Sequence, residues 1–140
     1  MKNDNNNAMI IHLSAFAGYL FPFGSIVAPL ILWQLQRDKS DFLNDHGKEA
    51  TNFNLSFLLY FTIIGILGFA FFFKALFNIA SIDETNISLE APIFDSTLFL
   101  LTLAGVLFLA VVKIVLIILA TIKANEGKTY EYPLTIRFIK

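Results

Sequence analysis

The chain of 140 residues contains no cysteine and few charged residues. Without cysteine there is no disulfide, no thiolate metal ligand and no thiol nucleophile. Charged residues make up 15% of the sequence, whereas a soluble globular protein carries about 25%. The net charge is −1, and the basic residues do not form the clustered face that nucleic-acid binding requires. A soluble domain and a nucleic-acid partner are therefore not expected.

What the chain has instead is apolar sequence, with 56% hydrophobic and 15% aromatic residues. Residues 5–36 and 50–73 carry no formal charge, and residues 96–122 carry only Lys113. Each run exceeds the roughly 20 residues that cross a ~30 Å hydrocarbon core as a helix. The sequence predicts one integral membrane domain over residues 1–140, an all-α compact bundle of three transmembrane helices. The predicted spans cover about residues 8–35, 52–78 and 96–123.

Lysine and arginine fall unevenly on the two sides of these spans. The loop after the first span and the C-terminal tail together hold seven of them: Arg37, Lys39, Lys48, Lys123, Lys128, Arg137 and Lys140. The opposite side holds only Lys2 and Lys74. By the positive-inside rule, the first loop and the C-terminus are predicted to be cytoplasmic, in a bacterial inner membrane. The N-terminus and the acidic loop over residues 82–95 are predicted to lie outside.

The first hydrophobic run contains Pro22, Gly24 and Pro29. Each proline lacks an amide donor and disturbs the carbonyl four residues earlier, so a kink or break is expected near residues 20–25. Three interpretations follow from this. The run is a kinked span, a discontinuous helix of the kind that transporters use, or a re-entrant hairpin that returns the N-terminus to the cytoplasm.

Polar residues inside the apolar runs are candidates for function. Lys113 is one, because a lysine at the bilayer centre costs about 2.5–3.5 kcal/mol on insertion scales. It either contacts an ion or substrate inside a bundle or extends its stem toward the headgroups. His12 and His46 are the only histidines, so no metal site and no cofactor are expected.

Residues 40–51 have the apolar spacing of a short amphipathic helix at the cytoplasmic interface. Ser40 or Asp41 can cap it, and Gly47 marks a bend or a close backbone contact. His46 and Glu49 are three residues apart and so can touch on a helix, which suits a general base. No nucleophile accompanies them, so an enzyme is not expected.

The tail over residues 124–140 has its own pattern. Gly127 is placed where a helix C-cap belongs, and alternating apolar residues then predict a short extended run. Tyr130, Tyr132 and Phe138 favour a membrane interface. The tail is predicted to lie along the inner membrane surface.

Four stretches resemble a known family: "HLSAFAGYLFPFG", "APLILW", "HGKEATNF" and "KANEGKTYEYPLTIRFIK". The chain is similar to the small membrane proteins catalogued as domain of unknown function 4870, themselves described as similar to the import subunit of the chloroplast inner-envelope translocon. The motif residues that carry the resemblance are His46, Gly47, Glu49, Ala50, Asn52, Phe53, Ala124, Gly127, Tyr130, Tyr132 and Pro133. The resemblance implies a compact domain of three or four spans, with both motifs cytoplasmic and no assigned activity. Glu49, Asn52 and His46 are then expected to hydrogen-bond the backbone of "NEGKTYEYP".

Two classes of function fit these observations. The first is a non-enzymatic accessory or scaffold subunit whose partners are the lipid bilayer and another membrane protein or a second copy. Gly65, Gly68 and Gly105 would permit its close helix contacts. The second is a small oligomeric channel or carrier that uses Pro22, Pro29 and Lys113.

Overall fold

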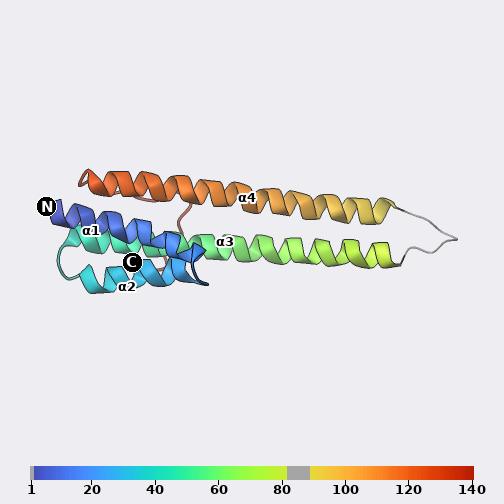
Figure 1. Ribbon diagram of the computed structural model, residues 1–140, viewed down its shortest axis with the longest axis horizontal. Helices are drawn as coiled ribbons and strands as arrows, with labels where there is room; N and C mark the ends of the chain where they lie inside the picture. Colours follow the sequence, from blue (N-terminus) through green and yellow to red (C-terminus); the bar gives the residue numbers. More distant parts are fainter. Residues whose placement is uncertain (1, 82–88) are drawn as a thin grey trace. The chain divides into compact units, whose positions relative to one another are not determined.

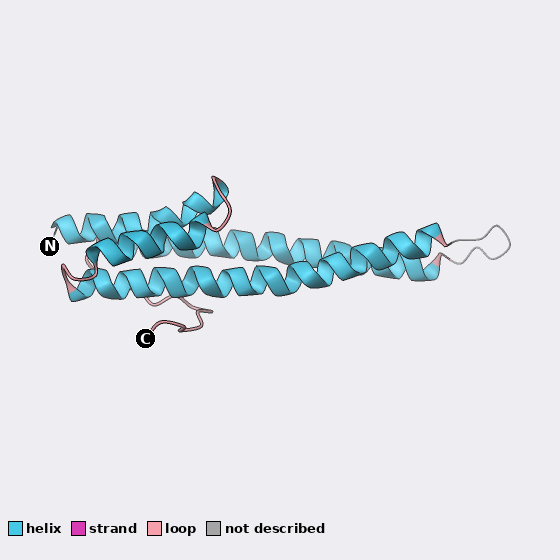
Figure 2. Cartoon of the chain, turned by 90° about the horizontal axis from the view of Figure 1, so that it is seen from below, coloured by secondary structure: helices cyan, strands magenta, loops and turns pink. Residues whose placement is uncertain are grey.

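The computed structural model describes residues 2–81 and 89–140, and every regular element within them is a helix (Figures 1 and 2). The elements are α1 (Lys2–Leu13), η1 (Ser14–Tyr19), α2 (Gly24–Gln36), α3 (Asp41–Ala80) and α4 (Glu90–Asn125). The predicted all-α class is confirmed. By its contacts the chain divides into unit 1 (Met1–Leu58 and Val112–Lys140) and unit 2 (Leu59–Val111).

The first hydrophobic run forms two short helices in unit 1, where a single span over 8–35 was predicted. α2 ends at Gln36, and α1 and α2 lie side by side (Figure 1). The helical path is interrupted at residues 20–23, where Pro22 lies in an exposed turn and Phe23 has a φ of 61°. The 13 residues of α2 extend about 20 Å, which is too short to cross a ~30 Å hydrocarbon core. Pro29 is buried inside α2.

The N-terminus lies beside the end of α4. The Nδ2 atom of Asn5 donates to the carbonyl of Asn125 at 3.1 Å, and the same asparagine lies against Gly127. The N-terminal helix and the start of the tail therefore lie near each other within unit 1. This geometry does not support an N-terminus on the side opposite the tail, and it agrees with the hairpin interpretation of the first run.

Small apolar residues bring the helices of unit 1 close together. Its core cluster consists of Ala8, Ile11, Leu43, Ala50 and Ala124, all fully buried. Because three of the five are alanines, α1, α3 and the end of α4 pack with little side-chain bulk between them. The core therefore fixes the start of α3, where the functional candidates lie.

Two polar contacts and one glycine fix the junction of α2 and α3. Ser40 caps α3 by accepting a hydrogen bond from the amide of Leu43 at 3.3 Å. The indole nitrogen of Trp33 donates to Oδ1 of Asn44 at 2.9 Å. A Cβ atom on Gly47 would collide with the Trp33 ring. The close backbone contact expected at Gly47 is thus made to the indole of α2.

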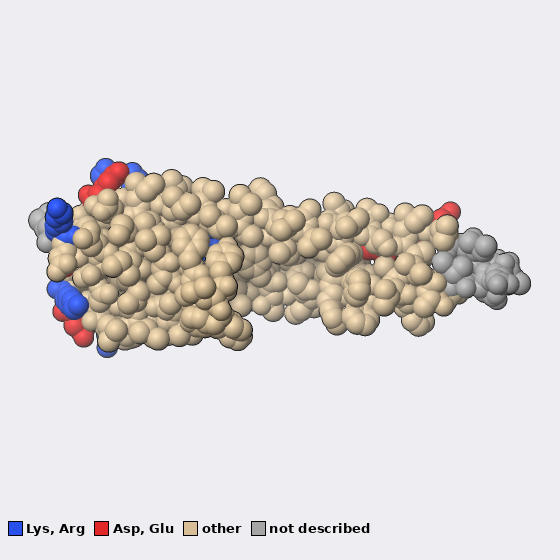
Figure 3. Space-filling view, in the orientation of Figure 1, with Lys and Arg blue, Asp and Glu red and all other residues tan. Residues whose placement is uncertain are grey.

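Two described helices, Asp41–Ala80 and Glu90–Asn125, are long and apolar enough to cross a membrane. A third predicted span has no such helix in the described ranges. The predicted interfacial segment 40–51 is not a separate helix, because α3 runs without a break from Asp41 to Ala80. Most of the visible surface carries no charge, and charged side chains gather at the end of unit 1 where α1 begins (Figure 3).

Unit 2 contains the second half of α3 and the first half of α4. Asp95 was predicted to lie in a solvated loop, but it belongs to α4 and is only 3% exposed. It accepts a hydrogen bond from Nδ2 of Asn78 at 2.7 Å and lies 3.9 Å from the Lys74 ammonium. These partners explain how a carboxylate is tolerated in an apolar unit. Residues 82–88 of the predicted loop lie outside the described residues.

Candidate functional site

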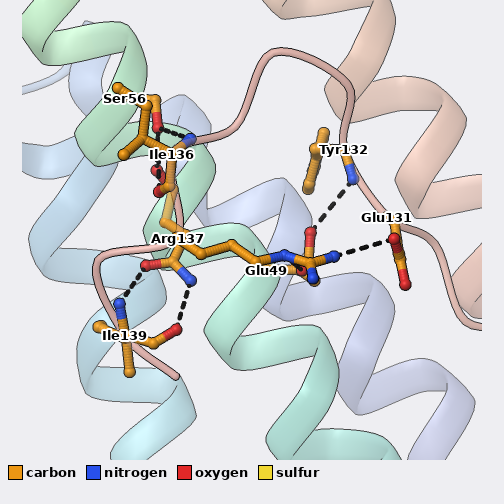
Figure 4. Close-up of polar contacts among 8 residues, drawn as sticks. Glu49, Ser56, Glu131, Tyr132, Ile136, Arg137 and Ile139 are labelled. Carbon is orange, nitrogen blue, oxygen red and sulfur yellow. Dashed lines mark hydrogen bonds and ion pairs between the residues drawn. The ribbon is translucent and has the colours of Figure 1, made fainter.

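A polar stripe on α3 holds the C-terminal tail in unit 1. Glu49, Asn52 and Ser56 are spaced three and four residues apart, so their side chains share one face of the helix. Tail backbone groups meet each of them (Figure 4). The amide of Tyr132 donates to Glu49 at 3.2 Å, and the amide of Ile136 donates to Oγ of Ser56 at 2.8 Å.

Asn52 makes the most complete contact with the tail. Its Oδ1 accepts from the amide of Ile139 at 2.9 Å, and its Nδ2 donates to the carbonyl of the same residue at 2.9 Å. An amide side chain can pair with a backbone in this way because it carries both a donor and an acceptor. The tail thus has a partner for its backbone although it forms no strand, in contrast to the predicted extended run.

Arg137 joins two acidic residues next to this stripe (Figure 4). Its guanidinium lies 2.9 Å from the carboxylate of Glu131 and 3.7 Å from that of Glu49. The exposed Glu131 pair contributes little, as surface ion pairs do. Glu49 is better covered, so it orients both Arg137 and the Tyr132 amide and is not available to orient His46 as a base.

A chain of three buried aromatic side chains links α1, α3 and the tail. The Tyr132 hydroxyl lies 3.0 Å from Nδ1 of His12, and Nε2 of His12 lies 2.7 Å from Nδ1 of His46. All three are at most 6% exposed. The Tyr132 ring also stacks on Phe53, with ring centroids 3.9 Å apart. Residues separated by 34 and 120 positions in the sequence are thereby joined.

The phenol determines which nitrogen carries each hydrogen. The Tyr132 hydroxyl has no other hydrogen-bond partner in the described part of the chain, so its hydrogen is satisfied only when it donates to Nδ1 of His12. His12 then carries its hydrogen on Nε2 and donates to Nδ1 of His46. Neutral His46 must therefore carry its hydrogen on Nε2. The backbone of Lys128 is the further hydrogen-bond partner of this buried ring.

Burial keeps this chain of hydrogen bonds neutral. Desolvation, followed by the effect of neighbouring His46, lowers the pKa of His12 to about 3. Burial also raises the pKa of the Tyr132 hydroxyl well above its ordinary value, with smaller contributions from Tyr130 and Glu49. Both shifts favour the uncharged forms, which are the forms that the hydrogen-bond assignment requires.

A pocket of about 440 Å³ opens between α3 and the tail in unit 1. It is lined by Asp45, His46, Lys48, Glu49, Asn52, Thr129, Tyr130, Glu131, Arg137, Ile139 and Lys140. No group of three or more histidine, cysteine or acidic side chains arranged to hold a metal ion occurs in residues 2–81 and 89–140.

The structure brings most of the predicted motif residues together. Gly127 adopts a φ of 73° at the end of α4, and its amide donates to the Ala124 carbonyl at 3.0 Å. Tyr130 makes an edge contact with Tyr132. Pro133 is exposed in the tail beside Leu134, whose φ is 62°. The motif around His46 and the tail motif thus form one site.

Other predicted residues lie elsewhere or have different partners. Pro22 and Pro29 belong to the α1–α2 hairpin, away from the tail contacts. Lys113 is half-buried in α4 without an ion pair or hydrogen bond to any described residue. Of the three side chains expected to bind the stretch "NEGKTYEYP", two do so. Glu49 accepts from the Tyr132 amide, and His46 has a backbone hydrogen bond with Lys128 in addition to its contact with the His12 ring. Asn52 binds Ile139 instead.

Sequence reasoning missed two members of the site. Ser56 gave no signal beyond its spacing from Glu49 and Asn52. His12 was considered only as a possible metal ligand, but it is fully buried beside His46 and Tyr132. A signal was present, because both histidines lie in stretches that carried the family resemblance. Their pairing was not expected because 34 residues separate them.

These features define a class: a small helical membrane protein whose C-terminal tail is hydrogen-bonded to the start of a long apolar helix. The family model for MamF and MmsF, the magnetosome magnetite crystal formation protein family, matches residues 3–139. The chain belongs to this family of small magnetosome membrane proteins. Comparison with curated proteins and with solved structures gave no match.

This match corrects the resemblance drawn from the sequence. The assignment to domain of unknown function 4870, and through it to a chloroplast import translocon subunit, is wrong, because the matching model is that of the magnetosome family. The four stretches that carried the resemblance all lie within residues 3–139. They therefore lie within the match to the magnetosome family, and no translocon role follows from them.

Proposed function

We propose that this chain is a non-enzymatic accessory protein of magnetite crystal formation, a scaffold that packs in the bacterial membrane against another membrane protein or a second copy. The family match gives the process. The observation that carries the scaffold role is the apolar surface of unit 2, where Ile66, Phe69 and Leu107 are each at least 60% exposed. An apolar surface of this kind is covered by lipid or by protein.

One groove of unit 2 offers little to a transported ion. This groove, of about 360 Å³, is lined by apolar side chains, two glycines and Thr102. The hydroxyl of Thr102 donates to the carbonyl of Phe99 in its own helix at 2.7 Å. A permeation path needs polar groups that replace the hydration shell of the ion. This composition favours the scaffold over the channel.

The channel or carrier remains the second candidate because of Lys113. An ammonium group without a partner inside an apolar helix is a functional-site hypothesis by default. In this alternative Lys113, with the hairpin that contains Pro22 and Pro29, would contact a transported anion. The predicted three-span, N-terminus-outside topology is not required by either candidate.

Purification in a mild detergent separates the two candidates. The scaffold should co-purify in a fixed ratio with one membrane protein, or form a defined oligomer, from a magnetite-forming bacterium. Liposomes that contain the pure chain should show no ion flux. Expression of this chain in a magnetite-forming strain that lacks its own family member should restore the size of the magnetite crystals. Electron microscopy measures that size. A solitary monomer that conducts ions, with the flux abolished by Lys113→Leu, would overturn the proposal in favour of the channel.

A further inference from the structure

The turn between η1 and α2 exposes large apolar side chains. Tyr19, Leu20, Phe21 and Phe23 are between 46% and 85% exposed. We call residues 19–23 the hairpin tip. It lies within residues 5–36, which carry no formal charge. Turns that face water are built mainly from small and polar residues, and a contiguous apolar patch marks a contact with protein or lipid. The hairpin tip therefore needs an apolar environment.

The backbone of the hairpin tip is suited to such an environment. The amides of Leu20 and Phe21 both donate to the carbonyl of Ala17, at 3.0 and 3.2 Å. The amide of Gly24 donates to the carbonyl of Phe21 at 3.1 Å, and Pro22 has no amide hydrogen. An unpaired backbone group in hydrocarbon costs several kcal/mol. These internal hydrogen bonds lower the cost of placing the turn in lipid.

Small residues hold the two arms of the hairpin together below the tip. A Cβ atom on Gly24 would collide with the carbonyl oxygen of Ala17. One on Gly18 would lie 2.8 Å from Cβ of Ser25. Small residues allow the same close approach between helices in membranes, where no hydrophobic effect drives the helices together. The arms therefore pack tightly without large side chains between them.

The position of the hairpin tip along α3 follows from the packing of Trp33 on Gly47. A short loop joins α2 to α3, and the two helices run in opposite directions (Figure 1). Gly24 precedes Trp33 by nine residues, about 13 Å of helix, so it lies at a level about nine residues beyond Gly47. The polar stripe of α3 ends there, at Ser56, and residues 57–73 carry no formal charge. The tip thus lies beside the start of the apolar part of α3.

We infer that the hairpin tip inserts into the acyl chains of one leaflet, so that α1 and α2 enter and leave through the same membrane surface. Lipid is the partner because α3 is long and apolar enough to cross a membrane, and the tip lies where its apolar part begins. The 13 residues of α2 extend about 20 Å, which does not reach the opposite surface. The inserted tip holds unit 1, with its bound tail, at that surface.

The absence of cysteine allows a fluorescent probe to be attached at one chosen position. Leu20→Cys places an environment-sensitive probe at the most exposed residue of the tip. The full chain is reconstituted in vesicles of phosphatidylcholine and phosphatidylglycerol. The matched control is Lys39→Cys, an exposed position beyond the other end of α2. Nitroxide groups on the lipid acyl chains should quench the probe at residue 20 and leave the probe at residue 39 nearly unchanged.

Aqueous iodide, present on both sides of the vesicles, should give the opposite result. It should quench the probe at residue 39 at least about fivefold more strongly than the probe at residue 20, because an ion does not enter hydrocarbon. Leu35→Cys, on the exposed face of α2 near its end, should give nitroxide quenching between these two extremes. Tyr19→Cys provides a second tip position. Circular dichroism shows which variants keep the helix content of the wild type.

Two results would overturn the insertion of the hairpin tip. Strong quenching of both tip probes by iodide would show that the tip lies in water, where a soluble partner could bind it. Protection of both tip probes from iodide and from the acyl-chain nitroxide would show that a second copy of the chain covers the tip. Neither result depends on the scaffold role, which co-purification tests separately.

Discussion

The chain of hydrogen bonds from Tyr132 through His12 to His46 depends on one hydroxyl group. The phenol supplies the hydrogen that assigns every later donor and acceptor in the chain. The same side chain fills the space against Phe53. Residue-scale substitutions can therefore separate the hydrogen bond from the packing.

Tyr132→Phe keeps the ring and removes only the hydroxyl. Nδ1 of His12 is then a buried acceptor without a donor, so the free energy of unfolding should fall by about 1–3 kcal/mol. Thermal unfolding in detergent, followed by circular dichroism, measures the change. Tyr130→Phe is the matched control, since the Tyr130 hydroxyl has no hydrogen-bond partner among the described residues. Equal effects of the two substitutions would contradict the hydrogen-bond chain.

The lowered pKa of His12 makes stability depend on pH. Its ordinary pKa is 6.5 and its folded pKa is about 3, so below pH 6.5 the unfolded state binds a proton that the folded state does not. Stability should be full above pH 6.5 and should fall as the pH decreases toward 3, by up to about 1.4 kcal/mol for each pH unit. Denaturant titrations at a series of pH values test this. His12→Gln should have a shallower slope, and an unchanged slope would show that His12 is not responsible.

At the scale of elements, the contact between α2 and α3 depends on a missing side chain. Gly47 lies against the indole of Trp33, and the space there cannot hold a Cβ atom. The contact also positions His46, the residue before Gly47, opposite His12. Gly47 thus allows this packing contact, although a glycine inside a helix destabilises the helix.

Two alanine substitutions on α3 should have opposite effects. Gly47→Ala should destabilise the protein by about 1–3 kcal/mol, because the added methyl group displaces the Trp33 ring. A Cβ atom at Gly65 would meet nothing within 4 Å. Gly65→Ala should therefore stabilise the helix by up to about 1 kcal/mol. Thermal unfolding of the two variants in the same detergent provides the comparison. A stable Gly47→Ala protein with unchanged Trp33 fluorescence would disprove the close contact.

At the scale of the whole molecule, the contact between the N-terminal helix and the end of α4 leads to a prediction of the membrane topology. Asn5 is hydrogen-bonded to Asn125 at the end of α4, so the N-terminus and the start of the tail share one end of unit 1. The two long apolar helices, α3 and α4, are those able to cross a membrane. If both helices cross a bilayer, we expect the N-terminus and the start of the tail to lie on the same side of it.

The absence of cysteine makes this placement easy to test. Asn6→Cys and Lys128→Cys introduce single thiols at exposed positions, one in α1 and one just after the end of α4. A membrane-impermeant maleimide should label both variants from the same face of sealed vesicles and neither from the other face. The cysteine-free wild type is the control for background labelling. Labelling from opposite faces would restore the predicted topology with the N-terminus outside.

The sequence by itself determined the helical class, the apolar character of the two long helices, and the break near Pro22. These properties follow from local composition and from the missing amide hydrogen of proline. Neither depends on tertiary contacts. It also indicated that the motif around His46 and the tail form one site, through Glu49. Local pattern was sufficient for that much.

Only the tertiary structure decided how the first run folds back, which ring His46 meets, and where the N-terminus lies. Hydropathy measures the cost of removing a segment from water, and it does not distinguish a span from two short helices packed on a neighbour. The pairing of His12, His46 and Tyr132 depends on chain reversal over 34 and 120 residues, and no local spacing encodes it. Packing of Ala8, Gly47 and Ala124 sets these distances, so the site exists only in the folded chain.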